Sequence, residues 1–379
     1  MAEVIKIAWF GAGFVGRSAS GTAQTARKAI VNLSKFYGVD IEITILLKSY
    51  KDFEIASKDS DLVNCKLEIL DNKNRKFLSS SRQFYKYCWS NRKNKIFDIL
   101  HFSVPRVYPF FDLFPASKFV ATFHAGGDVT IPQDKFILSR WIYNWIVKLQ
   151  WSRFNQIIAD SNFGVMEISN AYSIPIDRIS KVYLGADSYW PLNLEEHVKK
   201  PNEVTIVGRW QKYKNVHTAI NAIAEFNIDL LVPLNVQLIG KSNQLGHNLV
   251  KQAISSFSVG ELRTVDYLSD TQLAELYRET TIVIHPSINE GFGLPAFEAF
   301  GEGAVLIIHA GTPASELLSD FSGVIIENLT ATSGVKKALD RALKSFEIDI
   351  VSRRKYLFDI GATWQDMAKN YLETYRKLL

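Results

Sequence analysis

Short runs rich in β-branched and aromatic residues alternate along the chain with longer segments of helical periodicity, which is typical of parallel α/β sheets. The runs of the first half are Val4–Phe10, Ile41–Leu47, Ile96–Phe102, Lys118–Phe123, Gln156–Ala159 and Ile179–Tyr183. Those of the second half are Val204–Gly208, Val236–Gly240, Leu262–Tyr267, Thr281–His285, Ala304–His309 and Gly323–Ile326. The pattern predicts an α/β fold of two Rossmann-like doubly wound domains, with ligands in a cleft at the carboxyl ends of the strands.

A linker separates the two halves. The segment Tyr189–Pro201 contains two prolines and a charged cluster, and no strand or helix pattern. A chain of 379 residues also suits two domains of ordinary size. We therefore predict a first domain over residues 1–192 and a second over residues 200–361.

The composition is that of a folded globular chain, with 47% hydrophobic and 22% charged residues. Cys65 and Cys88 offer neither a disulfide framework nor metal-ligand spacing, which favours a reducing compartment. The N-terminus lacks the pattern of a signal peptide, and no run approaches the roughly 20 apolar residues of a spanning helix. We expect a cytoplasmic protein.

The net charge of +5 is unevenly distributed. Lys73–Lys95 holds eight basic residues and no acidic one, with aromatic residues between them. Two interpretations stay open: a solvated helix with an aromatic core face, or a patch that contacts an anionic membrane surface or a lipid-diphosphate acceptor. No nucleic-acid recognition motif accompanies the run. Aromatic residues at helical spacing over 136–154, including Trp141, Trp145 and Trp151, favour a core helix over a membrane-facing one.

The most informative motif joins two carboxylates, Glu290 and Glu298, through a glycine-rich loop. A hydrophobic run, Thr281–Ser287, precedes the motif, and a helical pattern begins at Pro295. Backbone N–H groups at a helix start, approached through glycines, bind diphosphates well. The flanking carboxylates can accept hydrogen bonds from hydroxyl groups. The motif therefore points to a sugar on a nucleoside diphosphate.

A second motif, Val207–Asn215, follows the first run of the second half and carries Arg209 and Lys214. A guanidinium can contact two phosphate oxygens at once, and the ammonium adds a second positive charge. The two cations are five positions apart across a strand-to-helix loop, so both can face one diphosphate. In a site without a metal, such cations neutralise the charge of the leaving group.

A dinucleotide fingerprint, Gly11–Gly16, follows the first run and favours an NAD(P)-dependent oxidoreductase as the alternative function. Two features oppose that alternative. The fingerprint should open a helix at once, yet Arg17–Thr22 continues in a loop-like pattern. The second run ends at Lys48, where a ribose-binding acid would be expected.

A further motif, Asp59–Asp61, has the Asp-x-Asp pattern by which some metal-dependent transferases hold a cation. No strong strand pattern precedes it, so we interpret it as a chance match and expect no metal site and no cofactor.

Together these motifs resemble retaining glycosyltransferases of the GT-B fold, in particular glycosyltransferase family 4. The resemblance covers residues 4–375 and is most specific in the second half. It implies that Glu298 holds the ribose, that Glu290 lies near the transferred sugar, and that Arg209 and Lys214 neutralise the diphosphate. Other donor-binding positions implied by the resemblance are Gly208, Gly240, Tyr267, Leu268, Phe292, Gly293 and Leu294. It also implies that the last helix, residues 362–379, packs back on the first domain.

For the first domain the resemblance implies a glycine-bearing loop that faces the diphosphate and the acceptor. Its residues are Gly13, Gly21 and Thr22, although Thr22 stands where relatives usually have a glycine. His124 is expected to contact the sugar or the departing oxygen, and Asp128 lies on the acceptor side. Asp160–Asn162 is interpreted as a fold marker and helix cap rather than as part of the chemistry.

The implied activity is transfer of a hexose, with mannose a candidate, from a GDP- or UDP-linked donor to a glycan or lipid-linked glycan. Surface-polysaccharide biosynthesis is the expected setting, with the protein in the cytoplasm or peripheral on the inner membrane face. The anomeric configuration would be retained through front-face attack. Besides the oxidoreductase, a sugar phosphorylase and a non-catalytic sugar-nucleotide-binding relative remain as alternatives.

Overall fold

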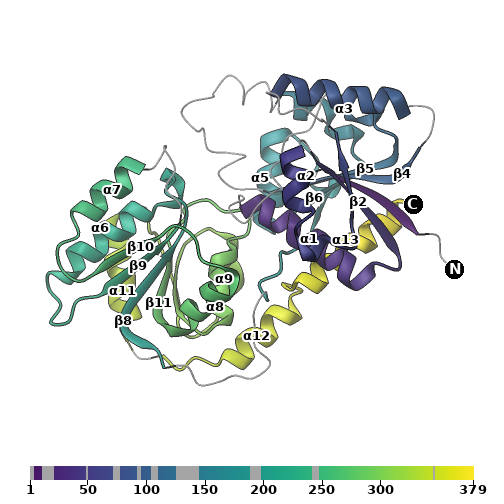
Figure 1. The fold of residues 1–379 in the computed structure, drawn as a ribbon. Helices are drawn as coiled ribbons and strands as arrows, with labels where there is room; N and C mark the ends of the chain where they lie inside the picture. The colour runs from purple at the N-terminus through teal and green to yellow at the C-terminus, as the bar shows by residue number, and fades with distance from the viewer. Residues whose placement is uncertain are drawn as a thin grey trace. The chain divides into compact units, whose positions relative to one another are not determined.

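A computed structural model gives the fold, and it describes residues 4–10, 21–47, 50–70, 77–91, 95–103, 110–124, 145–187, 198–240, 247–344 and 346–379. The chain forms two compact units (Figure 1). The first extends to Leu184 and includes Trp364–Leu379, and the second comprises Gly185–Thr363.

The first unit is built on a parallel sheet of seven strands in the order β3-β2-β1-β4-β5-β6-β7. The strands are β1 (Ile5–Phe10), β2 (Ile41–Leu47), β3 (Lys66–Ile69), β4 (Phe97–Phe102), β5 (Ala116–Phe123), β6 (Gln156–Ala159) and β7 (Ile179–Lys181). Its helices include α1 (Gly21–Tyr37), α2 (Tyr50–Ala56), α3 (Phe77–Asn91), α5 (Asn162–Tyr172) and α13 (Trp364–Leu378). The order reverses between β1 and β4, as in a doubly wound sheet.

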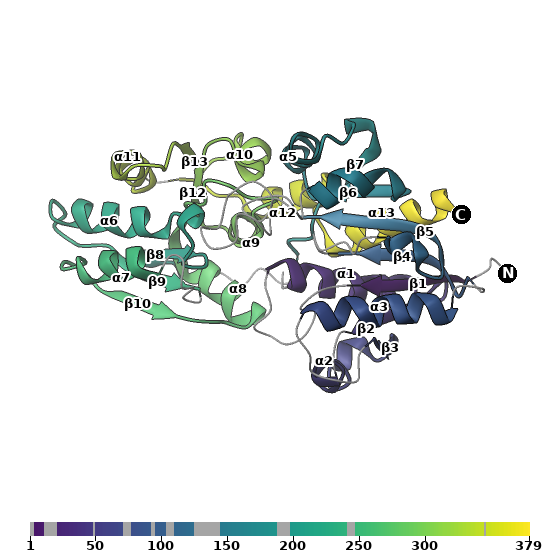
Figure 2. The ribbon, with the colours of Figure 1, turned by 90° about the horizontal axis from the view of Figure 1, so that it is seen from above.

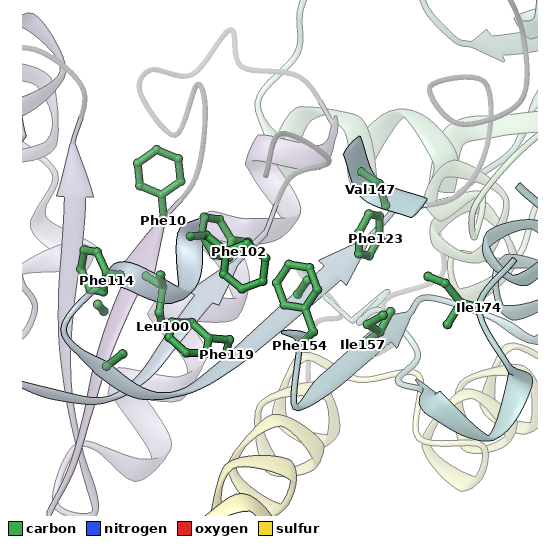
Figure 3. Packing of buried hydrophobic residues seen from close by; sticks show 14 of the residues in the cluster. Phe10, Leu100, Phe102, Phe114, Phe119, Phe123, Val147, Phe154, Ile157 and Ile174 are labelled. Carbon is green, nitrogen blue, oxygen red and sulfur yellow. The ribbon is translucent and has the colours of Figure 1, made fainter. Parts of the chain in front are cut away.

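Phenylalanine side chains dominate the core between this sheet and its helices (Figure 3). Phe102 on β4 and Phe123 on β5 both contact Phe154, which precedes β6. Phe154 in turn stacks on Phe111, with 4.3 Å between ring centroids. Because both residue 111 and residue 154 lie in connections between strands, this stack fixes the connections as well as the sheet.

Helix α13 packs against α1 in the first unit, as the sequence resemblance implied for the last helix (Figures 1 and 2). Two tyrosines of α13 reach buried polar groups of the sheet. The Tyr375 hydroxyl lies 2.5 Å from His101 Nδ1, and the Tyr371 hydroxyl lies 3.1 Å from Thr122 Oγ1. Thr122 Oγ1 is also 2.9 Å from His101 Nε2, so both imidazole nitrogens are satisfied. Trp9 stacks on the same imidazole at 4.1 Å.

This buried imidazole predicts a pH dependence of stability. Burial, with a smaller contribution from His124, lowers the pKa of His101 to about 3. The unfolded chain binds a proton at this histidine below about pH 6.5, whereas the folded chain does not, so stability falls as pH decreases. Between pH 7 and pH 5, wild type should lose roughly 2 kcal/mol more than His101→Gln. Chemical denaturation at both pH values measures the difference, and equal losses would contradict it.

The second unit contains a parallel sheet of six strands in the order β10-β9-β8-β11-β12-β13. They are β8 (Lys200–Val207), β9 (Asn235–Ile239), β10 (Leu262–Val265), β11 (Thr280–His285), β12 (Val305–His309) and β13 (Val324–Glu327). Its helices are α6 (Val216–Asn227), α7 (His247–Ser255), α8 (Asp270–Glu279), α9 (Leu294–Gly301), α10 (Pro313–Leu318), α11 (Thr332–Ala342) and α12 (Ile350–Asp359). Helices α6, α7 and α11 pack together, and α8, α9 and α12 form a second group (Figure 1). This sheet reverses its order between β8 and β11.

Candidate functional site

The loops after β8 and β11 meet at the point where the second sheet reverses its order. The Arg209–Lys214 loop follows β8, and the Glu290 loop follows β11, which is its neighbour. A backbone hydrogen bond of 2.9 Å from the Ile288 N–H to the Tyr213 carbonyl joins the two loops. Ligands of open α/β sheets bind at this position, so the fold brings the two sequence motifs to one place.

Lys214 and Glu290 form the centre of this site. Lys214 Nζ donates to Glu290 Oε1 at 2.5 Å, and the two side chains are 19% and 13% exposed. The buried imidazole of His285 lies with Nε2 3.2 Å from the same carboxylate oxygen. Burial alone would raise the pKa of Glu290, but the Lys214 ammonium and His285 outweigh it, and the pKa lies well below its usual range. Glu290 is therefore an anion that two neighbouring basic groups hold in place.

His285 is a member of the site that the sequence analysis treated only as the end of a strand. It is the last residue of β11 and is 2% exposed. A Cβ built on Gly293 would lie 3.4 Å from its Nε2, so this imidazole also supports the turn into α9. The sequence feature that could have identified His285 as part of the site is its position directly before Pro286 and five residues ahead of Glu290.

The turn into α9 has the backbone form that the glycine-rich loop predicted. Gly293 is the residue before the helix and has a φ of 91°, a conformation that favours glycine. The Phe292 side chain stacks on Phe297 at 4.2 Å in the interior, so only its backbone can face a ligand. Glu298 is in the second turn of α9, because the helix begins at Leu294. The helix dipole stabilises carboxylates mainly in the first turn, so it does not by itself explain a glutamate at position 298.

Arg209 differs from Lys214 in having no side-chain partner in the part of the chain that the structure describes. Its side chain is partly buried, and among the residues that the structure describes it makes no ion pair or side-chain hydrogen bond. A guanidinium held in a loop at the end of a parallel strand, with its donors unused, is suited to bind an anion.

Gly208 and Gly240 place the ends of β8 and β9 in close contact. Gly240 has a φ of 149°, and a Cβ at this position would lie 2.0 Å from the Gly208 carbonyl oxygen. Tyr267 and Leu268 follow β10, which is two strands away from β8; Tyr267 is exposed and Leu268 is partly buried. No described contact joins these two residues to Lys214 or Glu290.

The close approach of these glycines predicts that Gly240→Ala destabilises the second unit by about 3 kcal/mol, because the backbone of β8 must move. Gly311→Ala is the matched control, since Gly311 has a φ of 77° but nothing within 4 Å of a Cβ. That control should lose only about 1 kcal/mol. Urea unfolding of the two variants measures the difference, and equal losses would show that the contact with Gly208 is unimportant.

In the first unit His124 follows β5 and pairs with Asp160, which follows β6. His124 Nδ1 and Asp160 Oδ2 are 2.7 Å apart, and the side chains are 10% and 3% exposed. The helix cap expected near this point is present, but Ser161 supplies it by accepting from the Gly164 N–H at 2.9 Å. Asp160 itself contacts His124, a relation that the sequence analysis did not foresee.

Several predicted positions lie outside the described residues. These are Gly13, Asp128, the fingerprint Gly11–Gly16 and parts of Lys73–Lys95 and of the linker. Gly21 is the first residue of α1, and only the backbone of Gly21 and Thr22 is described. Asp59 and Asp61 both bind Arg27 of α1, at 2.7 and 2.6 Å, so their carboxylates have a structural partner.

Residues 193–352 match the family described as glycosyl transferases group 1. D-inositol 3-phosphate glycosyltransferase of Thermobifida fusca is 26% identical over 46% of this chain and 44% of its own. MMP alpha-(1->4)-mannosyltransferase of Mycolicibacterium hassiacum is 24% identical over 59% of this chain and 54% of its own. The GDP-mannose:cellobiosyl-diphosphopolyprenol alpha-mannosyltransferase of Komagataeibacter xylinus is 30% identical over 38% of each chain. The chain spans about half the length of the first of these curated relatives, and the residues that match the family model lie within the second unit.

Solved structures confirm the GT-B fold over the whole chain. Sucrose-phosphate synthase from Thermosynechococcus elongatus has a TM-score of 0.74 at 16% identity and covers 99% of both chains. Anabaena Alr3699/HepE in complex with UDP-glucose has a TM-score of 0.63 at 13% identity and covers 99% of this chain and 98% of its own. At such identity the likeness concerns the fold alone.

Proposed function

We propose that the chain is a glycosyltransferase that moves a hexose from a nucleoside-diphosphate sugar to an acceptor hydroxyl. The observation that carries the proposal is the meeting of Lys214, Glu290 and the start of α9 where the second sheet reverses its order. Arg209, without a partner among the described side chains, adds an unused cation at the end of β8. The group 1 match over residues 193–352 covers all of these positions.

In the proposed site Arg209 and Lys214 neutralise the diphosphate as it leaves. Lys214 has three N–H donors, so it can bind a phosphate oxygen while it keeps its hydrogen bond to Glu290. Glu290, held ionised by Lys214 and His285, accepts hydrogen bonds from hydroxyl groups of the sugar. Glu298, partly exposed on α9, accepts hydrogen bonds from the ribose.

The sequence resemblance further supports retention of the anomeric configuration, as in family 4, with the leaving oxygen taking the acceptor proton. In the first unit His124 would contact the sugar or the departing oxygen. The chain needs no resident metal in this scheme, because the two cations stabilise the negative charge that develops in the transition state. Full activity after treatment with EDTA would support this part of the proposal, and complete loss would contradict it.

The names of relatives and structural neighbours reduce the number of candidate donors and acceptors. Several relatives are named mannosyltransferases, including O-antigen chain mannosyltransferase RfbU of Salmonella typhimurium, and one is named for GDP-mannose. A structural neighbour is described in complex with UDP-glucose. We propose a GDP- or UDP-linked hexose, with mannose first, and a glycan or lipid-linked glycan acceptor in surface-polysaccharide synthesis.

A thermal-shift panel of UDP, GDP, ADP, dTDP, NAD and NADP tests the proposal, because a ligand that binds the folded state raises the melting temperature. A rise with one nucleoside diphosphate identifies the donor base, and radiolabelled transfer from the matching sugar nucleotide then tests catalysis. A rise with NAD or NADP alone would overturn the proposal in favour of the oxidoreductase. Binding of a sugar nucleotide without transfer to any glycan acceptor would favour the non-catalytic alternative.

We also propose that the first unit touches an anionic membrane surface through an apolar patch formed by Phe110, Leu113, Trp145 and Leu149. Each of these side chains is more than half exposed, so Trp145 is not in the core as expected. Their two segments lie together, because the Phe110 N–H donates to Gln150 at 2.7 Å. The patch is next to α3, which begins within the basic run. No described helix is long and apolar enough to cross a membrane.

Flotation with phosphatidylglycerol vesicles at low salt should recover the wild-type protein with the lipid. Leu113→Asp with Leu149→Asp should reduce recovery at least about tenfold, because two apolar contacts are lost and two negative charges are added. Leu231→Asp, at an exposed position of the second unit, is the matched control. Failure of the wild type to float would contradict the membrane proposal and would leave the donor site unaffected.

A further inference from the structure

The pairing of His124 with Asp160 follows from the register of the first sheet. Strands β5 and β6 are parallel neighbours, with Phe123 opposite Ala159. The residues that follow these two strand ends are therefore His124 and Asp160. Their side chains face each other, with 2.7 Å between His124 Nδ1 and Asp160 Oδ2. The pair thus belongs to the carboxyl edge of the sheet, where open α/β sheets bind ligands.

A structural role as a helix cap does not explain Asp160. Ser161 caps α5, as its side chain accepts from the Gly164 N–H. Asp160 is instead a carboxylate at 3% side-chain exposure whose Oδ2 contacts an imidazole, while Oδ1 has no hydrogen-bond partner among the described residues. A buried carboxylate is costly unless a partner compensates for it, so the contact with His124 is the reason to place one here.

Helix α13 brings Tyr371 close enough to Asp160 for the two groups to interact electrostatically. Burial and the charge of Asp160 raise the pKa of Tyr371, whose hydroxyl bonds to Thr122 on β5. The dipole of α5, which begins at Asn162, favours negative charge on the residues just before it. Asp160 is thus a buried carboxylate beside a largely buried imidazole.

We propose that Asp160 is a positioning residue that sets the tautomer and the orientation of His124. An ionised carboxylate can only accept, so the Nδ1 atom of His124 must carry the proton that joins the two side chains. Nε2 is then the nitrogen that meets a hydroxyl-bearing ligand, and in the neutral imidazole it does so as an acceptor. This role of Nε2 rests on the proposed function, in which His124 contacts the sugar.

Nitrogen-15 NMR of histidine-labelled protein tests the tautomer without any assay of activity. The chain has seven histidines, and the signals of His124 are assigned from their absence in His124→Gln. In wild type Nδ1 should be protonated. In Asp160→Asn the amide can donate to Nδ1, so the population with the proton on Nε2 should rise. Asp177→Asn, which alters an exposed acid of the same unit, should leave the spectrum of His124 unchanged. A wild-type His124 protonated mainly on Nε2 would overturn the proposal, whether or not the Asn variant folds.

Kinetics test whether the positioning matters for transfer. Asp160→Asn should lower kcat by about a hundredfold, by analogy with the loss of a group that orients a catalytic imidazole. The double variant with His124→Gln should be no slower than His124→Gln alone, because Asp160 acts through His124. Additive losses would overturn the proposal. If wild type transfers no sugar, the proposed function fails, and the NMR result still decides whether Asp160 positions the imidazole.

Discussion

Arg209→Ala should reduce sugar transfer by about 10²–10³-fold in kcat and leave the fold intact. In the proposed site the guanidinium contacts a developing charge that is largest in the transition state, so its removal should affect kcat more than donor affinity. Because Arg209 has no side-chain partner among the described residues, its loss should change the free energy of unfolding by less than about 0.5 kcal/mol. Single-turnover transfer assays and thermal melts measure the two quantities.

The matched control is Arg263→Ala, which removes an exposed arginine of β10 in the same unit. It should transfer sugar at the wild-type rate. Retention of more than about a third of wild-type kcat by Arg209→Ala would contradict the assignment of this residue to the diphosphate. A large fall in melting temperature would instead show that Arg209 has a structural role.

The fold was largely predictable because buried parallel strands leave a continuous hydrophobic signal. All six strands of the second sheet overlap the predicted runs, since strands such as Val305–His309 are almost entirely buried. The largest difference is at β8, which begins at Lys200, inside the predicted linker, rather than at Val204. One strand of the first sheet, β3 (Lys66–Ile69), was not predicted from the sequence. It lies at the sheet edge, is four residues long and has no fully buried side chain, so neither its length nor its pattern distinguishes it from a loop.

The candidate site was predictable as motifs but not as contacts. Glu290, Arg209 and Lys214 were identified because glycines and charges at fixed spacing follow strong strand patterns. The partners of these motifs were missed. His285 contacts Glu290 because the loop after β11 folds back on the end of its own strand, and Asp160 becomes a neighbour of His124 only through the pairing of β5 with β6. Pairing of this kind depends on sheet order and register, which a single sequence does not encode locally.

Lys214→Met should both reduce transfer and destabilise the protein, in contrast to the change at Arg209. Methionine keeps the length of the side chain but removes the ammonium that lies 2.5 Å from Glu290. A carboxylate only 13% exposed is then left with His285 alone, and the free energy of unfolding at pH 7 should fall by about 3 kcal/mol. Thermal melts and urea titrations measure the loss.

The pH dependence identifies the cause of that loss. In wild type the pKa of folded Glu290 is below its unfolded value, so its stabilising contribution is present above about pH 4.3 and is lost as the pH falls toward the lowered value. Without the ammonium, burial raises the pKa of Glu290 and only His285 opposes it. The variant is then destabilised as the pH rises, so the difference from wild type should widen from pH 4 to pH 7.

The double variant Lys214→Met with Glu290→Gln should recover most of the lost stability, because it removes the uncompensated charge while nearly keeping the side-chain volumes. It should not recover transfer, since the proposed site has then lost both the cation at the diphosphate and the acceptor for the sugar hydroxyls. If Lys214→Met alone is destabilised by the same amount at pH 4 and at pH 7, loss of the Lys214–Glu290 ion pair is not the cause of the destabilisation. Recovery of transfer in the double variant would show that Lys214 serves only to support Glu290 and does not contact the donor.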